Sequence, residues 1–160
     1  MARRVFYSFQ YDNDVMRVQQ IRNIHSIDDE SKPVTPTKWE EVKRGGDAAI
    51  HRWIDDNIGR ASCVVVLVGQ NTVDSKWVDY EIRKAWDDGK GLVGIYVHNL
   101  KDPNTGTCQQ GKNPFENVSL KNGRKLSEYV QCYNPVSYNA YNDIAGKLED
   151  LVEKAIANRQ

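Results

Sequence analysis

The chain has 160 residues, a length close to that of one average domain, and it is long enough to bury about two thirds of the surface that the unfolded chain exposes. Its 22 basic and 22 acidic side chains and a pI near 6.8 leave no electrostatic footprint for a nucleic acid or an anionic membrane. The longest uncharged apolar stretch, Ala61 to Gly69, is far shorter than the about 20 residues that span a bilayer, and no signal peptide is recognisable, so we expect a single cytoplasmic domain over residues 1–160.

The first predicted element is a strand over residues 5–9, Val-Phe-Tyr-Ser-Phe, because the run is β-branched and aromatic. The segment Asp12-Asn-Asp14 follows it and suits the N-cap of a helix. Four apolar residues give that helix a usable but imperfect stripe: Val15, Val18, Ile21 and Ile24.

Residues 26–38 contain two prolines and a polar majority, which predicts a mobile surface loop with at most a short edge strand. Beyond this loop, Asp47 is predicted to cap a helix that ends at Gly59. The two glycines before Asp47 match neither a P-loop nor a GxGxxG fingerprint, so they are interpreted as the start of the helix. The apolar residues of the helix recur at helical spacing: Ile50, Trp53, Ile54 and Ile58.

Two continuous β-branched runs, Ser62–Val68 and Leu92–Val97, are each bounded by glycine or asparagine, and both are typical of strands buried on two faces. Such strands alternating with amphipathic helices indicate right-handed βαβ crossovers. The predicted fold class is therefore α/β, doubly wound, with a mainly parallel sheet flanked by helices on both faces.

The C-terminal third begins with a polar stretch, residues 99–127, that is too long for an ordinary connection and is interpreted as an ordered functional loop or an insertion. Residues 128–133 can supply a last strand. A final helix follows, with a nearly ideal apolar stripe: Tyr141, Ile144, Leu148, Leu151, Val152, Ala155 and Ile156.

The cysteines and histidines are few and widely spaced. The three cysteines form neither a CxxC pair nor an even-numbered framework, so we expect reduced structural thiols. The three histidines lack the spacing of metal ligands, so no metal ion is expected. The residues concerned are Cys63, Cys108, Cys132, His25, His51 and His98.

The helix that begins near Ser75 carries an acid in its apolar stripe. With about 100° of rotation per residue, Glu81 falls between Trp77 and Val78, whereas the other charged residues of the helix lie on the opposite arc. A buried, unpaired carboxylate is unfavourable. It is kept either because a cation pairs with it or because it lines a polar cleft where its charge or raised pKa is used, and a Glu at the edge of the stripe that reaches solvent is the plain alternative.

Four stretches together are similar to a known family. Ser75-x-Trp77-Val-x-x-Glu81 resembles the Ser-x-Trp-Cys-x-x-Glu motif of TIR domains, with Val78 in place of the usual Cys. The first-strand region at residues 5–14, the Trp39 region and Gly111-Lys-Asn-Pro-Phe resemble the stand-alone TIR proteins of the bacterial Thoeris antiphage system. This resemblance covers about residues 3–135, and it implies a flavodoxin-like fold.

The resemblance also implies an activity. In catalytic TIR domains the motif Glu contacts the ribose next to nicotinamide and supports cleavage of the N-glycosidic bond of NAD, a role that carries over to Glu81. NAD⁺ is then the substrate and no further cofactor is expected. Members of the Thoeris type release a signalling isomer of cyclic ADP-ribose or a related conjugate, which implies a downstream effector that senses the product. Residues 26–38 resemble the loop by which TIR domains self-associate, so an isolated monomer is expected to be weakly active or silent.

Further substrate-binding candidates lie at the end of the first strand, because α/β sheets bind ligands beyond the carboxyl ends of their strands. They are Ser8, Phe9 and Tyr11, although core packing of Phe9 and turn formation by Tyr11 are equally consistent with the sequence. Trp77 is more consistent with a core anchor beside Glu81 than with a ligand contact. Trp39 could stack on a base or close the loop before it.

Three other readings compete with an NAD-cleaving enzyme. A non-catalytic TIR assembly module would use Glu81 only to organise an interface. A nucleoside deoxyribosyltransferase-like enzyme would keep the glycosidic-bond chemistry and change the substrate. A response-regulator receiver needs an Asp at the end of the third strand, where this chain has Leu-Val-Gly69, so it is excluded.

Overall fold

The computed structural model describes residues 3–24, 28–29 and 41–159, and its centre is a parallel sheet. Five strands are hydrogen-bonded in the order β2-β1-β3-β4-β5, and all four pairings are parallel. This confirms the predicted doubly wound α/β fold class. The strands are β1 (Arg4–Ser8), β2 (Asp28–Asp29), β3 (Cys63–Val68), β4 (Gly91–Tyr96) and β5 (Cys132–Tyr133).

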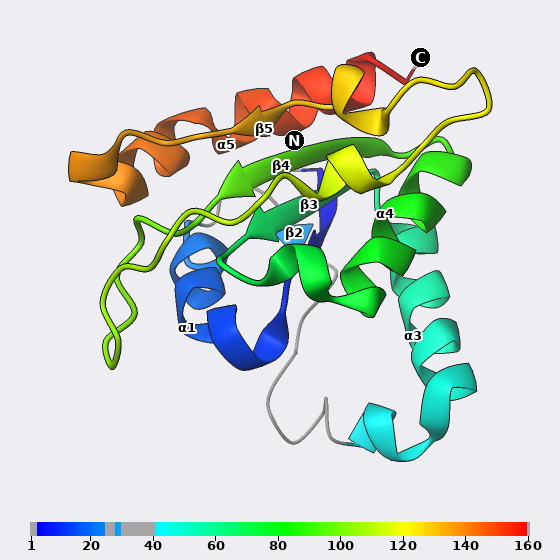
Figure 1. Cartoon of the computed structure of the whole chain (residues 1–160), viewed down its shortest axis with the longest axis horizontal. Helices are drawn as coiled ribbons and strands as arrows, with labels where there is room; N and C mark the ends of the chain where they lie inside the picture. The colour runs from blue at the N-terminus through cyan, green and yellow to red at the C-terminus, as the bar shows by residue number, and fades with distance from the viewer. Residues whose placement is uncertain (1–2, 25–27, 30–40, 160) are drawn as a thin grey trace.

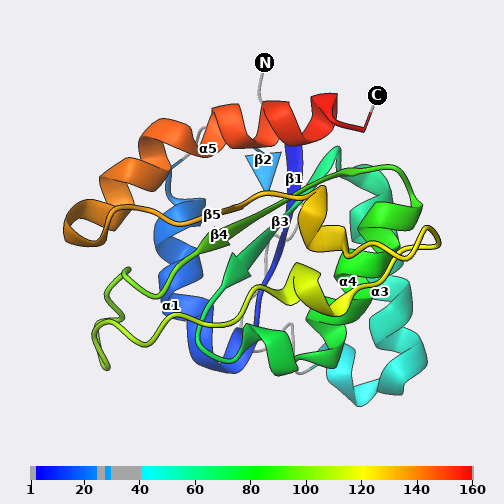
Figure 2. The same cartoon turned by 45° about the horizontal axis from the view of Figure 1, so that its top comes forward.

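Helices cover both faces of the sheet (Figures 1 and 2). One face is covered by α1 (Tyr11–Arg22) and α5 (Ala140–Ala157), which also contact each other. The other face is covered by α3 (Gly46–Arg60) and α4 (Lys76–Asp87). The molecule therefore has three layers, with the sheet in the middle.

The two central strands are buried on both sides, as their continuous apolar sequence predicted. Every residue of β3 is buried, and in β4 only Tyr96 is partly exposed. Successive side chains of a strand point to opposite faces. In β3, Val64, Val66 and Val68 therefore pack against the α3 and α4 layer, and the alternate residues pack against α1 and α5.

Two predicted helix caps are wrong. Helix α1 begins at Tyr11, after Gln10, whose side chain makes no capping hydrogen bond, so the helix starts before the segment Asp12 to Asp14 rather than after it. Helix α3 begins at Gly46, which has a φ of 81°, so Asp47 lies in the first turn instead of capping it. An acid in the first turn still favours the helix through the macrodipole.

The C-terminal third differs from the prediction mainly in its strand. Residues 126–128 form a short 3-10 helix, and β5 contains only two residues where six were expected. The final helix is confirmed, and its apolar stripe is buried except for Tyr141, which is 40% exposed.

Among the described residues no helix is long and apolar enough to cross a membrane. The three cysteines are free thiols.

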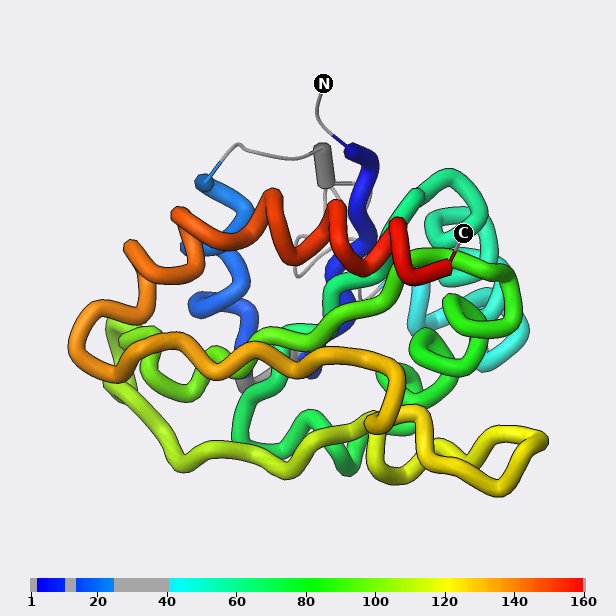
Figure 3. Tube along the Cα trace, turned by 90° about the horizontal axis from the view of Figure 1, so that it is seen from above, coloured from blue at the N-terminus to red at the C-terminus, as the bar shows by residue number. Residues whose placement is uncertain are grey.

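The segment after β4 crosses the carboxyl end of the sheet and touches the turn that follows β3. Gly111 lies directly against the carbonyl oxygen of Gly69, the residue that follows β3, so closely that no Cβ could be accommodated there. Figure 3 shows this segment running along one side of the molecule before the turn between Ser119 and Lys125, drawn in yellow, projects from the body. A glycine at position 111 therefore allows the loop to lie on the sheet edge.

Replacing Gly111 with alanine is expected to lower the free energy of unfolding by about 1 to 3 kcal/mol, because the added methyl group would push the loop off backbone atoms that cannot move aside. Gly59→Ala is the matched control, since a Cβ at Gly59 meets nothing within 4 Å and alanine favours the helix. Urea denaturation measures both variants. Equal stability of the two would show that the loop does not need this close approach.

Candidate active site

Helix α4 places one acid inside the protein. Ser75 caps the helix, and its Oγ accepts a hydrogen bond of 3.2 Å from the backbone N–H of Val78. The buried face of α4 consists of Val78, Glu81, Ile82 and Ala85. Glu81 is only 6% exposed, so the alternative of a glutamate that reaches solvent from the edge of the apolar stripe does not hold.

The partner of Glu81 comes from the other end of the sequence. The hydroxyl of Ser8 donates a hydrogen bond of 2.7 Å to Glu81 Oε1 inside the protein, across 73 residues of chain. Ser8 is the last residue of β1 and is fully buried. Strand alternation puts Ser8 on the same face as Phe6, which packs in the α3 and α4 layer. The structure thus brings together two of the sequence-predicted residues.

Burial dominates the electrostatics of Glu81. Desolvation raises the pKa of its carboxyl to about 8, and the Ser8 hydrogen bond opposes this only in part. Within the described part of the chain no Lys, Arg or His forms an ion pair with Glu81. Pairing with a cation therefore does not explain why this acid is buried.

The other predicted residues lie in different surroundings. Phe9 is half-buried and packs against the core on the α1 and α5 side, which is the core-packing alternative. Trp77 is half-buried against the α3 and α4 core, with the His51 ring 5.2 Å away and the Lys76 ammonium 4.7 Å from its ring centroid. The side chain of Tyr11 and the whole of Trp39 lie outside the described residues.

The Ser8 and Glu81 pair lies where a doubly wound sheet binds ligands. The strand order reverses between β1 and β3, and the carboxyl ends of neighbouring strands at such a point form a crevice. Ser8 is at this end of β1 and Glu81 reaches it from α4. The arrangement offers one carboxyl group of raised pKa, held by a hydroxyl and surrounded by apolar side chains. Such a group can exchange a proton near neutral pH or stabilise a developing positive charge.

The sequence reading missed a second buried ionic group. Arg17 Nη1 lies 3.3 Å from Asp14 Oδ1, and both side chains are almost fully buried in α1. Arg17 also donates to the carbonyl oxygens of Leu100 and Gly106, at 2.9 and 2.8 Å, and so ties the segment after β4 to α1. The i, i+3 spacing of Asp14 and Arg17 between apolar residues was the available signal.

Comparison with known proteins agrees with this geometry. Residues 6–102, which include Ser8, Glu81 and all of β3 and β4, match the family described as Thoeris protein ThsB, TIR-like domain. The chain is also 30% identical over 152 residues to ThsB1 of Bacillus cereus (strain MSX-D12), a protein whose name gives it, provisionally, as a cyclic ADP-D-ribose synthase. The match covers 91% of this chain and 78% of that protein. The chain belongs to the TIR-like ThsB family of Thoeris proteins.

Proposed function

We propose that this protein cleaves the nicotinamide N-glycosidic bond of NAD⁺ and releases a cyclic ADP-ribose-type signalling nucleotide in antiphage defence. The observation that carries the proposal is the buried carboxyl group of Glu81, which accepts a hydrogen bond from Ser8 at the C-terminal end of β1. Within the described structure this carboxyl group has no cationic partner. Membership of the ThsB family and the name of the Bacillus cereus relative support it.

The proposed reaction breaks the bond between ribose C1 and the nicotinamide nitrogen. The bonding electron pair moves to the pyridinium nitrogen, which becomes neutral, and C1 acquires oxocarbenium character. A nucleophilic atom of the same ADP-ribose unit then bonds to C1 and loses a proton, which closes the ring. A fixed carboxylate stabilises the positive charge at C1 most strongly where water is excluded.

Glu81 meets this requirement in two stages. In the free protein the Glu81 pKa of about 8 keeps this carboxyl group mostly protonated at neutral pH, so no charge is buried among the apolar side chains. The nicotinamide ring of NAD⁺ is cationic, and an opposite charge within about 4 to 6 Å lowers the pKa of a carboxyl group. Substrate binding would therefore favour the ionised form that the reaction needs, and Ser8 would hold the carboxylate in place.

A purely structural role for Glu81 explains less. An assembly module gains little from an acid that is 6% exposed, because so little of the residue is available to the broad surface of a partner chain. A leucine or methionine at this position would remove the cost of desolvating the carboxyl group. The buried acid is therefore more consistent with an enzyme than with a scaffold.

Glu81→Gln is expected to fold and to lower NAD⁺ turnover by about a hundred-fold or more, because the amide keeps the shape and the hydrogen bond from Ser8 but removes the charge. Chromatography of NAD⁺ incubated with each variant measures turnover and identifies the product. Glu149→Gln, an exposed change on α5, is the matched control and should retain full turnover. Turnover by Glu81→Gln within a few-fold of wild type would place the chemistry elsewhere.

The raised pKa of Glu81 also predicts how stability depends on pH. The folded protein binds the proton of the Glu81 carboxyl group more tightly than the unfolded chain does. The protonated group therefore contributes fully to the free energy of unfolding below about pH 4.5, and this contribution is lost as the pH rises to about 8. Glu81→Gln has no such titration. Its Tm minus that of wild type should rise across this interval and then level off in thermal melts. A constant difference would mean that the Glu81 carboxyl titrates normally.

We further propose that the TIR domain self-associates to become fully active and that a separate effector senses the product. The basis is the resemblance of residues 26–38 to the loop through which TIR domains pack together. Of that segment the structure describes only β2, a two-residue strand at the edge of the sheet. An added copy would complete the crevice and make activity depend on mass action.

Specific activity is therefore expected to fall on dilution. Turnover per molecule is measured across an about hundred-fold dilution series, with light scattering on the same samples to give the oligomeric state. Turnover and the fraction of oligomer should decrease together. Full turnover by a strictly monomeric sample, independent of concentration, would contradict the self-association proposal while leaving the role of Glu81 intact.

A further inference from the structure

The carboxyl end of β3 is covered, although the ligand crevice of a doubly wound sheet opens at this edge. Gly69, the residue that follows β3, is buried. It touches the Asp14 carboxyl group of α1 on one side and Gly111 on the other. The backbone N–H of Gly69 also donates a hydrogen bond of 2.7 Å to the hydroxyl of Thr72. The β3 end of the crevice is therefore closed by packing and fixed in place.

Residues 108–113, the strap, are the part of the segment after β4 that crosses this edge of the sheet. Two hydrogen bonds hold the strap close to the end of β4. The backbone N–H of Cys108 donates to the carbonyl oxygen of His98 at 3.0 Å. The side chain of Gln110 is hydrogen-bonded to the hydroxyl of Tyr96. The strap is thus anchored immediately before it reaches the turn after β3.

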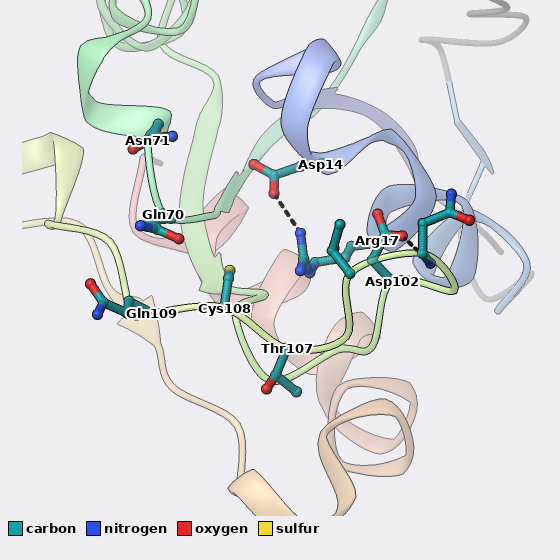
Figure 4. Close-up of a pocket in the computed structure, with 10 residues that line it drawn as sticks. Asp14, Arg17, Gln70, Asn71, Asp102, Thr107, Cys108 and Gln109 are labelled. Atoms are coloured by element: carbon teal, nitrogen blue, oxygen red, sulfur yellow. Dashed lines mark hydrogen bonds and ion pairs between the residues drawn. The ribbon is translucent and has the colours of Figure 1, made fainter.

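Solvent lies close to the strap. A polar groove of about 690 Å³ occupies the α1 face of the sheet edge, opposite to the face that holds Glu81. Figure 4 shows Gln70 and Asn71 of the turn after β3 across from Gln109 of the strap, and these three exposed residues line the groove. The contact of the strap with the turn therefore stands between this open groove and the crevice.

The proposed reaction has two possible products, and water decides between them. Once nicotinamide has left, ribose C1 has oxocarbenium character. A nucleophilic atom of the same ADP-ribose unit can bond to C1 and lose its proton, which gives the cyclic product. Alternatively, the oxygen of a water molecule bonds to C1 and loses a proton, which gives linear ADP-ribose. Both routes release nicotinamide and one proton, and a closed site favours the first because it prevents hydrolysis of the reactive intermediate.

We propose that the strap determines the product of this reaction, because it covers the β3 end of the crevice and keeps water away from ribose C1. The inference rests on the proposed cleavage of NAD⁺ and adds the residues that direct its outcome. Gly111 and Gln110 determine specificity without touching the reacting atoms. Gly111 allows the strap to approach the carbonyl oxygen of Gly69, and Gln110 anchors the strap to Tyr96.

The test compares the products that wild type and two loosened variants form from NAD⁺, separated by chromatography. Gly111→Ala adds a methyl group that the Gly69 carbonyl oxygen cannot accommodate, and Gln110→Ala removes the bond to Tyr96. In both variants the ratio of linear ADP-ribose to cyclic product should rise several-fold. Gln109→Ala, a change of the neighbouring exposed glutamine, is the matched control and should leave the ratio unchanged. Gln110→Ala keeps the inference testable if Gly111→Ala does not fold.

Hydrogen–deuterium exchange of peptides that contain Gly69, followed by mass spectrometry, shows independently whether the strap has loosened. Exchange should be faster in both variants than in the control. Unchanged exchange, or a fall in total turnover with an unchanged product ratio, would overturn the inference, because the strap would then be only a structural support.

The wild-type protein separates this inference from the proposed function. Release of linear ADP-ribose alone by wild type would overturn the role of the strap and leave cleavage of the N-glycosidic bond intact. A wild type without any turnover of NAD⁺, under the conditions that activate it, would refute the proposed function and this inference with it.

Discussion

Desolvation of the Glu81 carboxyl group is the constraint on which the site depends. The cost is met only in part by one hydrogen bond from Ser8, so the group remains protonated at a pH where a surface glutamate would be ionised. Every neighbouring layer contributes to this state. Strand β1 ends where Ser8 can reach the acid, and α4 directs its remaining charges outward, with Arg83 and Asp79 paired 2.8 Å apart at the surface.

The two buried acids of the sheet edge are held in opposite ways. Asp14 has a guanidinium partner that is itself bonded to two backbone carbonyl groups, so this pair fixes α1 to the segment after β4. Glu81 has only a hydroxyl. The buried ion pair holds two elements together, whereas a carboxyl group without a cationic partner remains available to a cationic ligand. Gly69, which touches both the Asp14 carboxyl and Gly111, separates the two regions.

The fold class and the position of Glu81 on the apolar face of its helix could be predicted from the sequence, because both follow from the periodicity of apolar residues. Continuous apolar runs identify strands buried on two faces, and an acid within a helical stripe stands out against them. The caps of α1 and α3 could not be predicted, since Gln10 and Gly45 cap their helices without a side-chain bond, and any residue could do so. The Ser8 contact with Glu81 required the register of β1 against β3, which no local pattern specifies. A two-residue strand such as β5 carries too little sequence to be recognised.

The parallel topology has a consequence for the order of folding. Strands β3 and β4 and the helix between them are contiguous in sequence, whereas β1 must pair with β3 across a long intervening segment, Val5 with Cys63. Loop-closure entropy delays contacts of such separation, so the unit from β3 to β4 is expected to form first and to accept β1 later. Ser8 then reaches Glu81 only in the last stages. A partly folded chain therefore carries the Glu81 carboxyl group without the hydroxyl that positions it.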